Sequence, residues 1–150
     1  MGTHYRGTEE EVRALDAYIK LLRAADSTTS RLSRHMSTKG LTVSQFGTLE
    51  ALLHLGPLFQ CDLGKKLLKS GGNVTMVVDN LQKRGLVERR REGEDRRFVK
   101  VSLTEEGRKL IGDFFPCHAA AIVEEMRALT PPEQEELGRL CRKLGRREKA

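Results

Sequence analysis

The first forty residues place apolar side chains at helical spacing, with charged residues between them. The positions that share one face of a helix over residues 9–39 are Val12, Leu15, Ile19, Leu22, Leu32 and Met36. Such a helix is longer than a small domain needs to cover its own core. We therefore expect a partner chain to cover its apolar face.

Three shorter helices follow, each with a start or stop signal. Thr42 as N-cap and Gln45 three residues later form a capping box for a helix that ends at Gly56-Pro57. A third helix is predicted over residues 60–68. After a break at residues 70–72, a fourth helix over residues 73–84 ends at Gly85, because glycine readily adopts the left-handed conformation.

The pattern then changes to two short strands and two further helices. Residues 86–91 and 98–103 favour strands, and residues 92–95 between them favour a turn. Thr104 then caps a helix through Met126, and Thr130-Pro131 opens a last one. The predicted fold is mainly α with a small β-hairpin wing, in a single domain of residues 1–150.

The composition indicates a basic chain without a membrane span or a disulfide framework. Its 150 residues carry a formal charge of +6, which favours polyanionic partners such as nucleic acid. No apolar run approaches the roughly 18 residues of a spanning helix, so we expect a soluble, cytoplasmic protein without membrane partners. Cys61, Cys117 and Cys141 are odd in number and widely spaced, which indicates reduced thiols.

Two short helices, a tight turn and a basic hairpin occur in the order of a winged helix-turn-helix. The second helix of such a pair fits the major groove of B-DNA, while the hairpin reaches the neighbouring minor groove. Residues 83–100 hold eight cations against four acids, a local charge of +4 that suits phosphate neutralisation. Taken alone, the same hairpin also fits a solvated surface whose Arg and Glu residues pair across the strands.

Residues 41–107 resemble the MarR family of winged-helix regulators. The resemblance rests on "LTVSQF", the Leu63/Leu67 helix, "GNVTMVVDNLQKRGLVERR" and "DRRFVKVSLTEEG", the last of which fits a D-x-R wing followed by a Leu-Thr-x-x-Gly helix start. It implies a winged segment of about residues 41–103 and dimerisation helices of about residues 9–39 and 104–146. It further implies a homodimeric transcriptional repressor or activator whose affinity for DNA is changed by a small molecule or by oxidation. Of these, we expect a repressor that binds an inverted-repeat operator in double-stranded DNA.

The resemblance also implies roles for individual residues. Asn73, Thr75 and Met76 would face base edges, Ser70 and Asn80 would contact phosphates, and Lys65, Lys66 and Lys69 would add backbone contacts. In the wing, Arg97 would enter the minor groove and Asp95 would orient it, with Arg90, Arg91 and Arg96 beside them. The structural alternative is that Asn73 and Thr75 only cap the helix and that Asp95 only closes a turn.

A narrower similarity joins "GPLFQCDLGKKLLKSGGNVTMVVDNL" and "FFPCH" to MarR members that respond to quinones and related phenolic electrophiles. It implies a small-molecule effector between the dimerisation helices and the winged segment. The candidate sensor residues are His35, Met36, His54, Cys61, Cys117 and His118. Each of them also has an ordinary structural role, as a small hydrophobic thiol or a surface or core histidine.

Cys61 adds thiol modification as a second route of control. A helix N-terminus with Lys65 and Lys66 one turn on would favour its thiolate. The peroxide-sensing MarR subgroup carries its cysteine in the first helix, where residues 9–39 have none, so that route is not expected.

Other function classes find less support in the sequence. No nucleophile elbow, phosphate loop or metal-ligand spacing indicates an enzyme, a cofactor or a bound metal. Cys117 and His118 are adjacent on a helix and point in different directions, which makes a metal-responsive regulator the weaker alternative. A winged module that binds an acidic protein partner is the remaining one.

Overall fold

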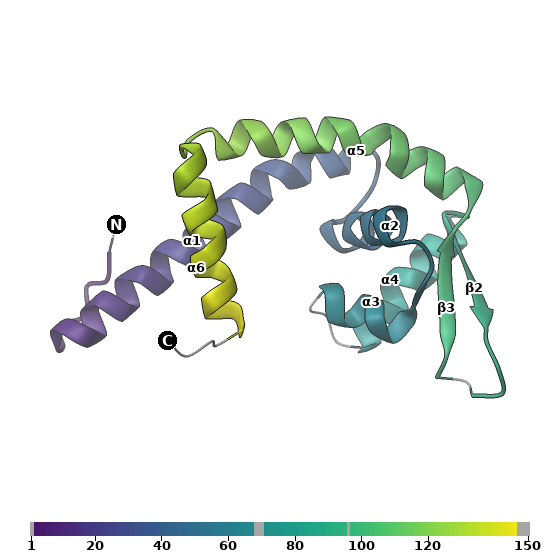
Figure 1. Ribbon diagram of the computed structural model, residues 1–150, viewed down its shortest axis with the longest axis horizontal. Coiled ribbons are helices and arrows are strands. Elements are labelled where there is room, and N and C mark those ends of the chain that lie inside the picture. Colours follow the sequence, from purple (N-terminus) through teal and green to yellow (C-terminus); the bar gives the residue numbers. More distant parts are fainter. Residues whose placement is uncertain (1, 68–70, 96, 147–150) are drawn as a thin grey trace. The chain divides into compact units, whose positions relative to one another are not determined.

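The computed structural model describes residues 2–67, 71–95 and 97–146. Figure 1 shows the helices and strands that these residues form. In chain order they are α1 (Glu9–Ser37), α2 (Val43–Leu55), β1 (Leu58–Phe59), α3 (Gln60–Leu67), α4 (Gly71–Lys83), β2 (Val87–Arg91), β3 (Val99–Leu103), α5 (Glu105–Met126) and α6 (Pro131–Arg146). The predicted mainly α fold with a β-hairpin wing is confirmed.

The chain divides into two compact units, residues 1–118 and residues 119–150. The first unit holds α1 to β3 and the start of α5, and the second holds the end of α5 and α6. Within the described residues, no helix is both long and apolar enough to cross a membrane.

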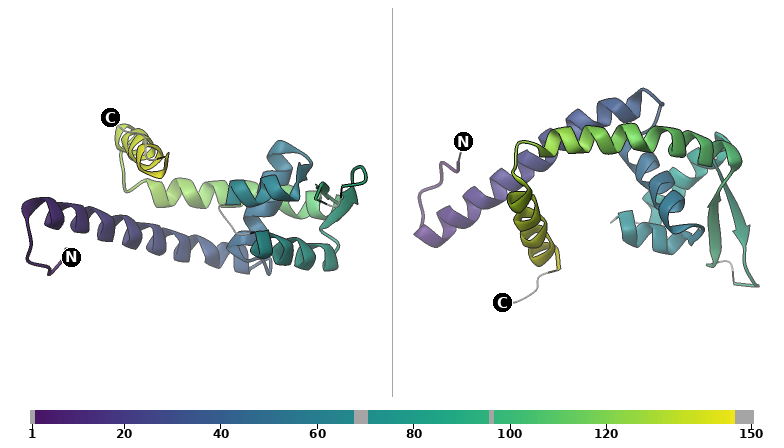
Figure 2. Two further views of the ribbon diagram at one scale, coloured as in Figure 1. Left: turned by 90° about the horizontal axis from the view of Figure 1, so that it is seen from below. Right: turned by 45° about the horizontal axis from the view of Figure 1, so that its top comes forward.

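Helix α1 begins at a capping box and continues without interruption to Ser37. The Thr8 side chain accepts from the backbone N–H of Glu11, whose carboxylate in turn accepts from the backbone N–H of Thr8 at 2.9 Å. Figure 2 shows that the N-terminal half of α1 extends away from α2, α3 and α4. Met36, near the C-terminal end, is the one buried residue of this fully described helix.

The winged segment packs around one core of aliphatic and aromatic side chains. Its fully buried apolar members come from α2, α3, α4, β2, β3 and α5. They are Phe46, Leu49, Leu52, Leu63, Val74, Val78, Leu81, Val87, Val101 and Ile111. Interiors of this kind supply most of the favourable free energy of folding. Helices α2, α3 and α4 are thereby held as one body with the sheet.

The sheet has three antiparallel strands in the order β1-β3-β2. Val87 pairs with Leu103 at one end of the hairpin and Arg91 with Val99 at the other. Strand β1 pairs with β3 through two residues and was not predicted, because two residues after Gly56-Pro57 are too short for an alternating pattern to appear.

The Leu-Thr-x-x-Gly start of α5 closes the winged segment. The Thr104 hydroxyl donates to the carbonyl oxygen of Gly85 at 2.6 Å and accepts from the backbone N–H of Gly107 at 3.0 Å. A Cβ at position 107 would lie 1.9 Å from the carbonyl oxygen of Leu86, so only glycine fits there. Thr104 and Gly107 therefore fix the end of α4 against the start of α5.

Predicted element ends differ from the structure by one or two residues. Helix α4 begins at Gly71 instead of Asn73, since glycine also adopts helical angles. The left-handed end of this helix at Gly85, with φ of 71°, is as predicted. The capping box of Thr42 and Gln45 is confirmed by hydrogen bonds of 3.0 and 3.2 Å.

Candidate nucleic-acid interface

Helix α4 has a buried face and an exposed face. Val74, Val78 and Leu81 are at most 2% exposed and belong to the core. The exposed side chains include the four α4 residues predicted to face DNA, namely Asn73, Thr75, Met76 and Asn80. An α-helix with this outward surface has the size and chemistry to enter a major groove.

Hydrogen bonds from two other elements hold α4 in place near its middle. The Gln60 side chain at the start of α3 donates to the Thr75 hydroxyl at 2.9 Å. The Arg89 guanidinium on β2 donates to the Thr75 carbonyl oxygen at 3.2 Å and forms an ion pair with Asp79. These positioning contacts could not be predicted from the sequence, because partners 10 to 15 residues apart on different elements leave no local signal.

Asp95 and Arg97 form a fork at the tip of the hairpin. The Arg97 Nε donates to both carboxylate oxygens at 3.1 Å, and a terminal guanidinium nitrogen donates to Oδ2 at 2.8 Å. This side-chain bond lowers the pKa of Asp95 and raises the pKa of Arg97. The predicted Asp95–Arg97 contact is thus present, with the Arg97 side chain 86% exposed.

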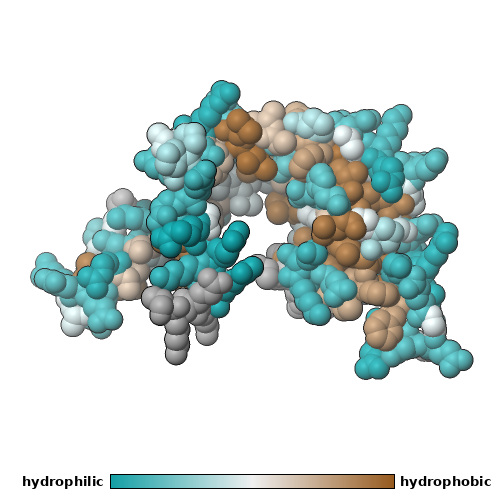
Figure 3. Space-filling view, in the orientation of Figure 1, coloured by the Kyte–Doolittle hydropathy of each residue, from teal (hydrophilic) through white to brown (hydrophobic). Residues whose placement is uncertain are grey.

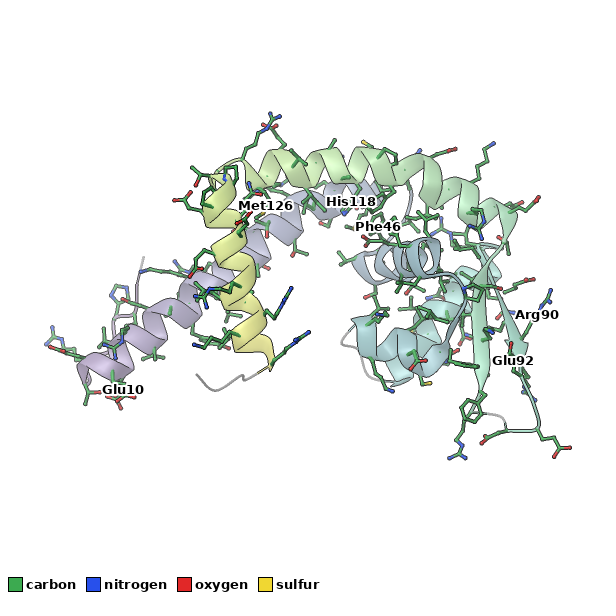
Figure 4. All side chains as sticks on the ribbon, viewed as in Figure 1. Glu10, Phe46, Arg90, Glu92, His118 and Met126 are labelled. Carbon is green, nitrogen blue, oxygen red and sulfur yellow. The ribbon has the colours of Figure 1, made fainter. Side chains whose placement is uncertain are left out.

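The lower right of Figure 3 shows that the hairpin end of the molecule is largely hydrophilic, with an apolar side chain among the hydrophilic ones. Phe98, directly after Arg97, is 46% exposed. Arg90, Arg91 and Arg97 are exposed, and Figure 4 shows Arg90 pointing outward from β2. The Arg90 guanidinium lies 3.5 Å from a carboxylate oxygen of Glu88. An exposed pair of this kind contributes little and can exchange its carboxylate for a phosphate.

Other cations of residues 83–100 have partners within the chain. Arg84 donates to the carbonyl oxygen of Gly40 at 2.8 Å, and Lys100 pairs with Glu92 across the hairpin at 3.0 Å. Together with Arg89 they hold elements together. The alternative of a hairpin paired across its strands therefore describes the Lys100–Glu92 pair, whereas Arg84 and Arg89 bond to other elements. Arg90 and Arg97 pair with Glu88 and Asp95, but their side chains stay 78% and 86% exposed.

Helix α3 adds two exposed lysines beside α4. Lys65 lies 3.5 Å from Asp62 with its side chain 80% exposed, and Lys66 is exposed as well. Three other predicted DNA-contacting residues, Lys69, Ser70 and Arg96, lie outside the described residues.

Two of the candidate sensor residues line one pocket. This pocket of about 580 Å³ has three apolar lining residues, Leu86, Leu110 and Phe114. His35 and Cys117 line it together with Thr38 and the charged residues Lys39, Glu106, Lys109 and Asp113. Its size suits a small organic molecule that carries polar groups.

The other candidate sensor residues lie elsewhere. His118 is 4% exposed, and its ring centroid lies 4.2 Å from that of Phe46, toward which it points in Figure 4. Burial lowers the pKa of His118, and its Nδ1 has no hydrogen-bond partner among the described residues. Met36 belongs to the core, and His54 is exposed beside Phe115.

The three cysteines are free and exposed. Cys61 lies on α3 and is absent from the pocket that Cys117 lines. The described part of the chain holds no cluster of three or more His, Cys, Asp or Glu residues placed to bind a metal ion.

Comparison with known proteins finds a matching family model and similar transcriptional regulators. A MarR family model matches residues 39–97, from the end of α1 to the wing. The chain is 35% identical over 138 residues to the HTH-type transcriptional regulator YkoM of Bacillus subtilis, covering 91% of this chain and 90% of the relative. It is 34% identical over 133 residues to the HTH-type transcriptional regulator MhqR of the same organism, covering 89% and 92%.

A solved structure agrees with these relatives. It is that of BpsR from Bordetella bronchiseptica, whose DNA binding is regulated by 6-hydroxynicotinic acid. The two chains are 27% identical with a TM-score of 0.79, over 86% of this chain and 98% of the other. The likeness therefore extends from the winged segment to most of the chain.

Proposed function

Since the chain belongs to the MarR family and is a DNA-binding transcriptional regulator, we propose that it acts as a homodimeric repressor on an inverted-repeat operator. In this proposal residues 41–103 bind DNA, while helices of residues 9–39 and 104–146 form the dimer. The observation that carries it is that the winged segment exposes both the polar face of α4 and an arginine at the tip of its hairpin.

The proposed binding mode follows from the placement of those side chains. Asn73, Thr75 and Met76 meet base edges in the major groove, while Asn80 and the lysines of α3 meet phosphates. Arg97 enters the adjacent minor groove, because the negative potential of that groove attracts a cation. Asp95 holds the guanidinium in a fixed orientation until DNA is bound.

Homodimer formation is supported by the apolar residues that the terminal helices expose. Leu22 of α1 and Leu140 of α6 are about half exposed, at 50% and 48%. A second copy of the chain can cover such surfaces, because a two-fold axis brings the same apolar patch of each chain together and buries both. Two copies then present two α4 helices to successive major grooves.

The proposed effector is a small phenolic or quinone-like molecule in the pocket lined by His35 and Cys117. Leu86, Leu110 and Phe114 suit an aromatic ring, and Lys39 and Asp113, which also line the pocket, suit a hydroxyl or carbonyl group. Regulation of the similar BpsR by 6-hydroxynicotinic acid, a hydroxylated ring, supports this class of ligand. Release from DNA requires that the effector bind the two states unequally.

Selection from random duplexes, followed by mobility shifts at several salt concentrations, tests the proposal. We expect an inverted repeat to be enriched and the logarithm of affinity to fall steeply with that of salt, by about 0.9 for each phosphate contact. Binding without sequence preference would favour the alternative of an acidic protein partner.

Titration of the selected complex with phenols and quinones tests the effector. We expect release to be lost in Phe114→Ala, which opens the pocket, and to be kept in Cys61→Ala if the ligand acts without thiol modification. If Cys61→Ala instead prevents release by quinones while phenols still act, modification of this thiol is the route of control.

A further inference from the structure

Met76 is an apolar side chain that the fold does not use. It is 57% exposed on α4, where Val74 and Val78 on the opposite face are at most 2% exposed. Exposure of a long apolar side chain on a short helix contributes nothing to the core. Its place on the surface that faces DNA in the proposed function gives it a different use.

The residues around Met76 define where it would lie in a groove. Positions 73, 76 and 80 recur with the spacing of one helical face, so Asn73 and Asn80 lie on either side of Met76 along α4. A helix laid in the major groove along this face places one apolar group between two amides. Among the groups that base pairs present there, the apolar one is the 5-methyl group of thymine.

The backbone at this point of α4 is fixed from two elements. Gln60 holds the side chain of Thr75, and Arg89 holds the carbonyl group of Thr75, the residue directly before Met76. The flexible thioether thus starts from a fixed Cα and can adapt only over its own length. A fixed start favours contact with one base position instead of several.

On this basis, and resting on the proposed function, we propose that Met76 recognises the methyl group of one thymine in each half-site of the operator. Met76 is then a specificity-determining residue: it separates thymine from cytosine at that position by an apolar contact, without a hydrogen bond.

The test replaces thymine by deoxyuridine, which removes only the methyl group. Duplexes selected by the full chain are resynthesised with one thymine replaced at a time, and the dissociation constant of each is measured by fluorescence anisotropy. We expect one position per half-site at which the replacement weakens binding three- to five-fold, the value of one buried methyl group. Replacements at the other thymines should change affinity by less than that.

Variants assign the effect to this side chain. Met76→Ala should bind the thymine and deoxyuridine duplexes equally well, whereas Met76→Leu, of similar volume, should keep the difference. Val43→Ala, which removes another exposed apolar side chain from α2, is the matched control and should also keep it. Thermal unfolding of each variant shows whether the fold is unchanged.

The outcomes separate the inference from the function on which it rests. A chain that enriches an inverted repeat but binds every deoxyuridine duplex as well as the parent overturns the role of Met76 alone. The same holds if Met76→Ala keeps the full sensitivity to the methyl group. A chain that enriches no sequence contradicts the proposed function, and the inference with it.

Discussion

The winged segment and the terminal helices satisfy their hydrophobic patterns in different ways. Between Leu41 and Leu103 most of the described apolar side chains pack in one core, with Leu63 and Val101 fully buried. Helix α1 buries one residue of 29, and α6 buries none of its 16. An apolar helix face that stays exposed in one chain is typical of a helix that packs against a second surface.

The difference shows which property each region supplies. A closed core gives the α4 surface and the wing a fixed geometry that does not depend on a partner. In the proposed homodimer, the exposed faces of α1 and α6 set the spacing of two such surfaces, one from each chain. Stability of the first region and assembly of the second should therefore respond to different substitutions.

The largest effect is expected from charges on the apolar face of α6. Leu137→Lys combined with Leu140→Lys should prevent dimer formation, because two ammonium groups would have to be buried at the interface. Loss of the second half-site should weaken operator binding by about 100-fold or more. Analytical ultracentrifugation and anisotropy measure the two effects.

Glu135→Lys is the control for these lysines, since position 135 lies on the opposite, polar side of α6. It should leave the sedimentation coefficient unchanged. A double variant that sediments like the parent chain would remove α6 from the dimer interface.

The next effect separates the two regions directly. Leu63→Ala opens a cavity in the core and should lower the free energy of unfolding by about 2–5 kcal/mol at any protein concentration. Leu22→Ala on α1 removes the same atoms from a half-exposed site. Its effect should appear as a shift in the concentration dependence of unfolding, because it weakens association rather than the core.

Guanidinium unfolding at two protein concentrations, tenfold apart, measures both variants. If the midpoint of the parent chain does not move with concentration, the terminal helices contribute nothing by association, and the contrast between the regions fails.

Arg97→Ala should have a smaller effect that is confined to DNA. The side chain is exposed, so unfolding should not change, while operator affinity should fall by about tenfold for each chain of the dimer, the value of one charge-assisted hydrogen bond. The salt dependence should also become shallower, by about one phosphate contact for each chain. Lys66→Ala provides a comparison cation on α3, and equal losses in both would mean that Arg97 acts only as a charge.

The smallest effect concerns His118 at the end of the core. Burial lowers its pKa below the value of 6.5 of an unfolded chain, with Glu50 opposing and His35 adding to the shift. The unfolded state therefore binds the proton first, so stability should be full above pH 6.5 and fall as the pH drops toward the pKa of the folded state. Chemical unfolding from pH 7.5 to 5 measures this slope.

His118→Phe should flatten that slope, because phenylalanine fits among Phe46 and Phe114 without a proton to bind. His54→Phe alters an exposed ring and should keep it. A slope that survives in His118→Phe would assign the pH dependence to another group.

Local rules predicted much of this fold, and contacts between elements account for the rest. The Thr42 capping box and the stop at Gly85 depend on neighbours within three or four residues, so they are visible in the sequence. Arg89 looks like any cation of a basic wing, yet its guanidinium reaches Asp79 and Thr75 on another element. Only the folded chain distinguishes it from Arg90.

The proposed effector site is the part that the sequence predicted least well. His35, Cys117 and His118 came from motif similarity, but two of them line a pocket and the third packs on Phe46 inside the core. Whether a histidine or thiol meets solvent depends on its helix face and on the packing around it, which spacing along one chain does not determine.

Hydroxyl-radical footprinting on the selected operator tests the central claim most directly. Two copies of α4 on one duplex should protect two major-groove half-sites whose centres lie about 10 base pairs apart, with minor-groove protection outside them that disappears in Arg97→Ala. A single unsymmetrical footprint, or one unaffected by Arg97→Ala, would contradict the account.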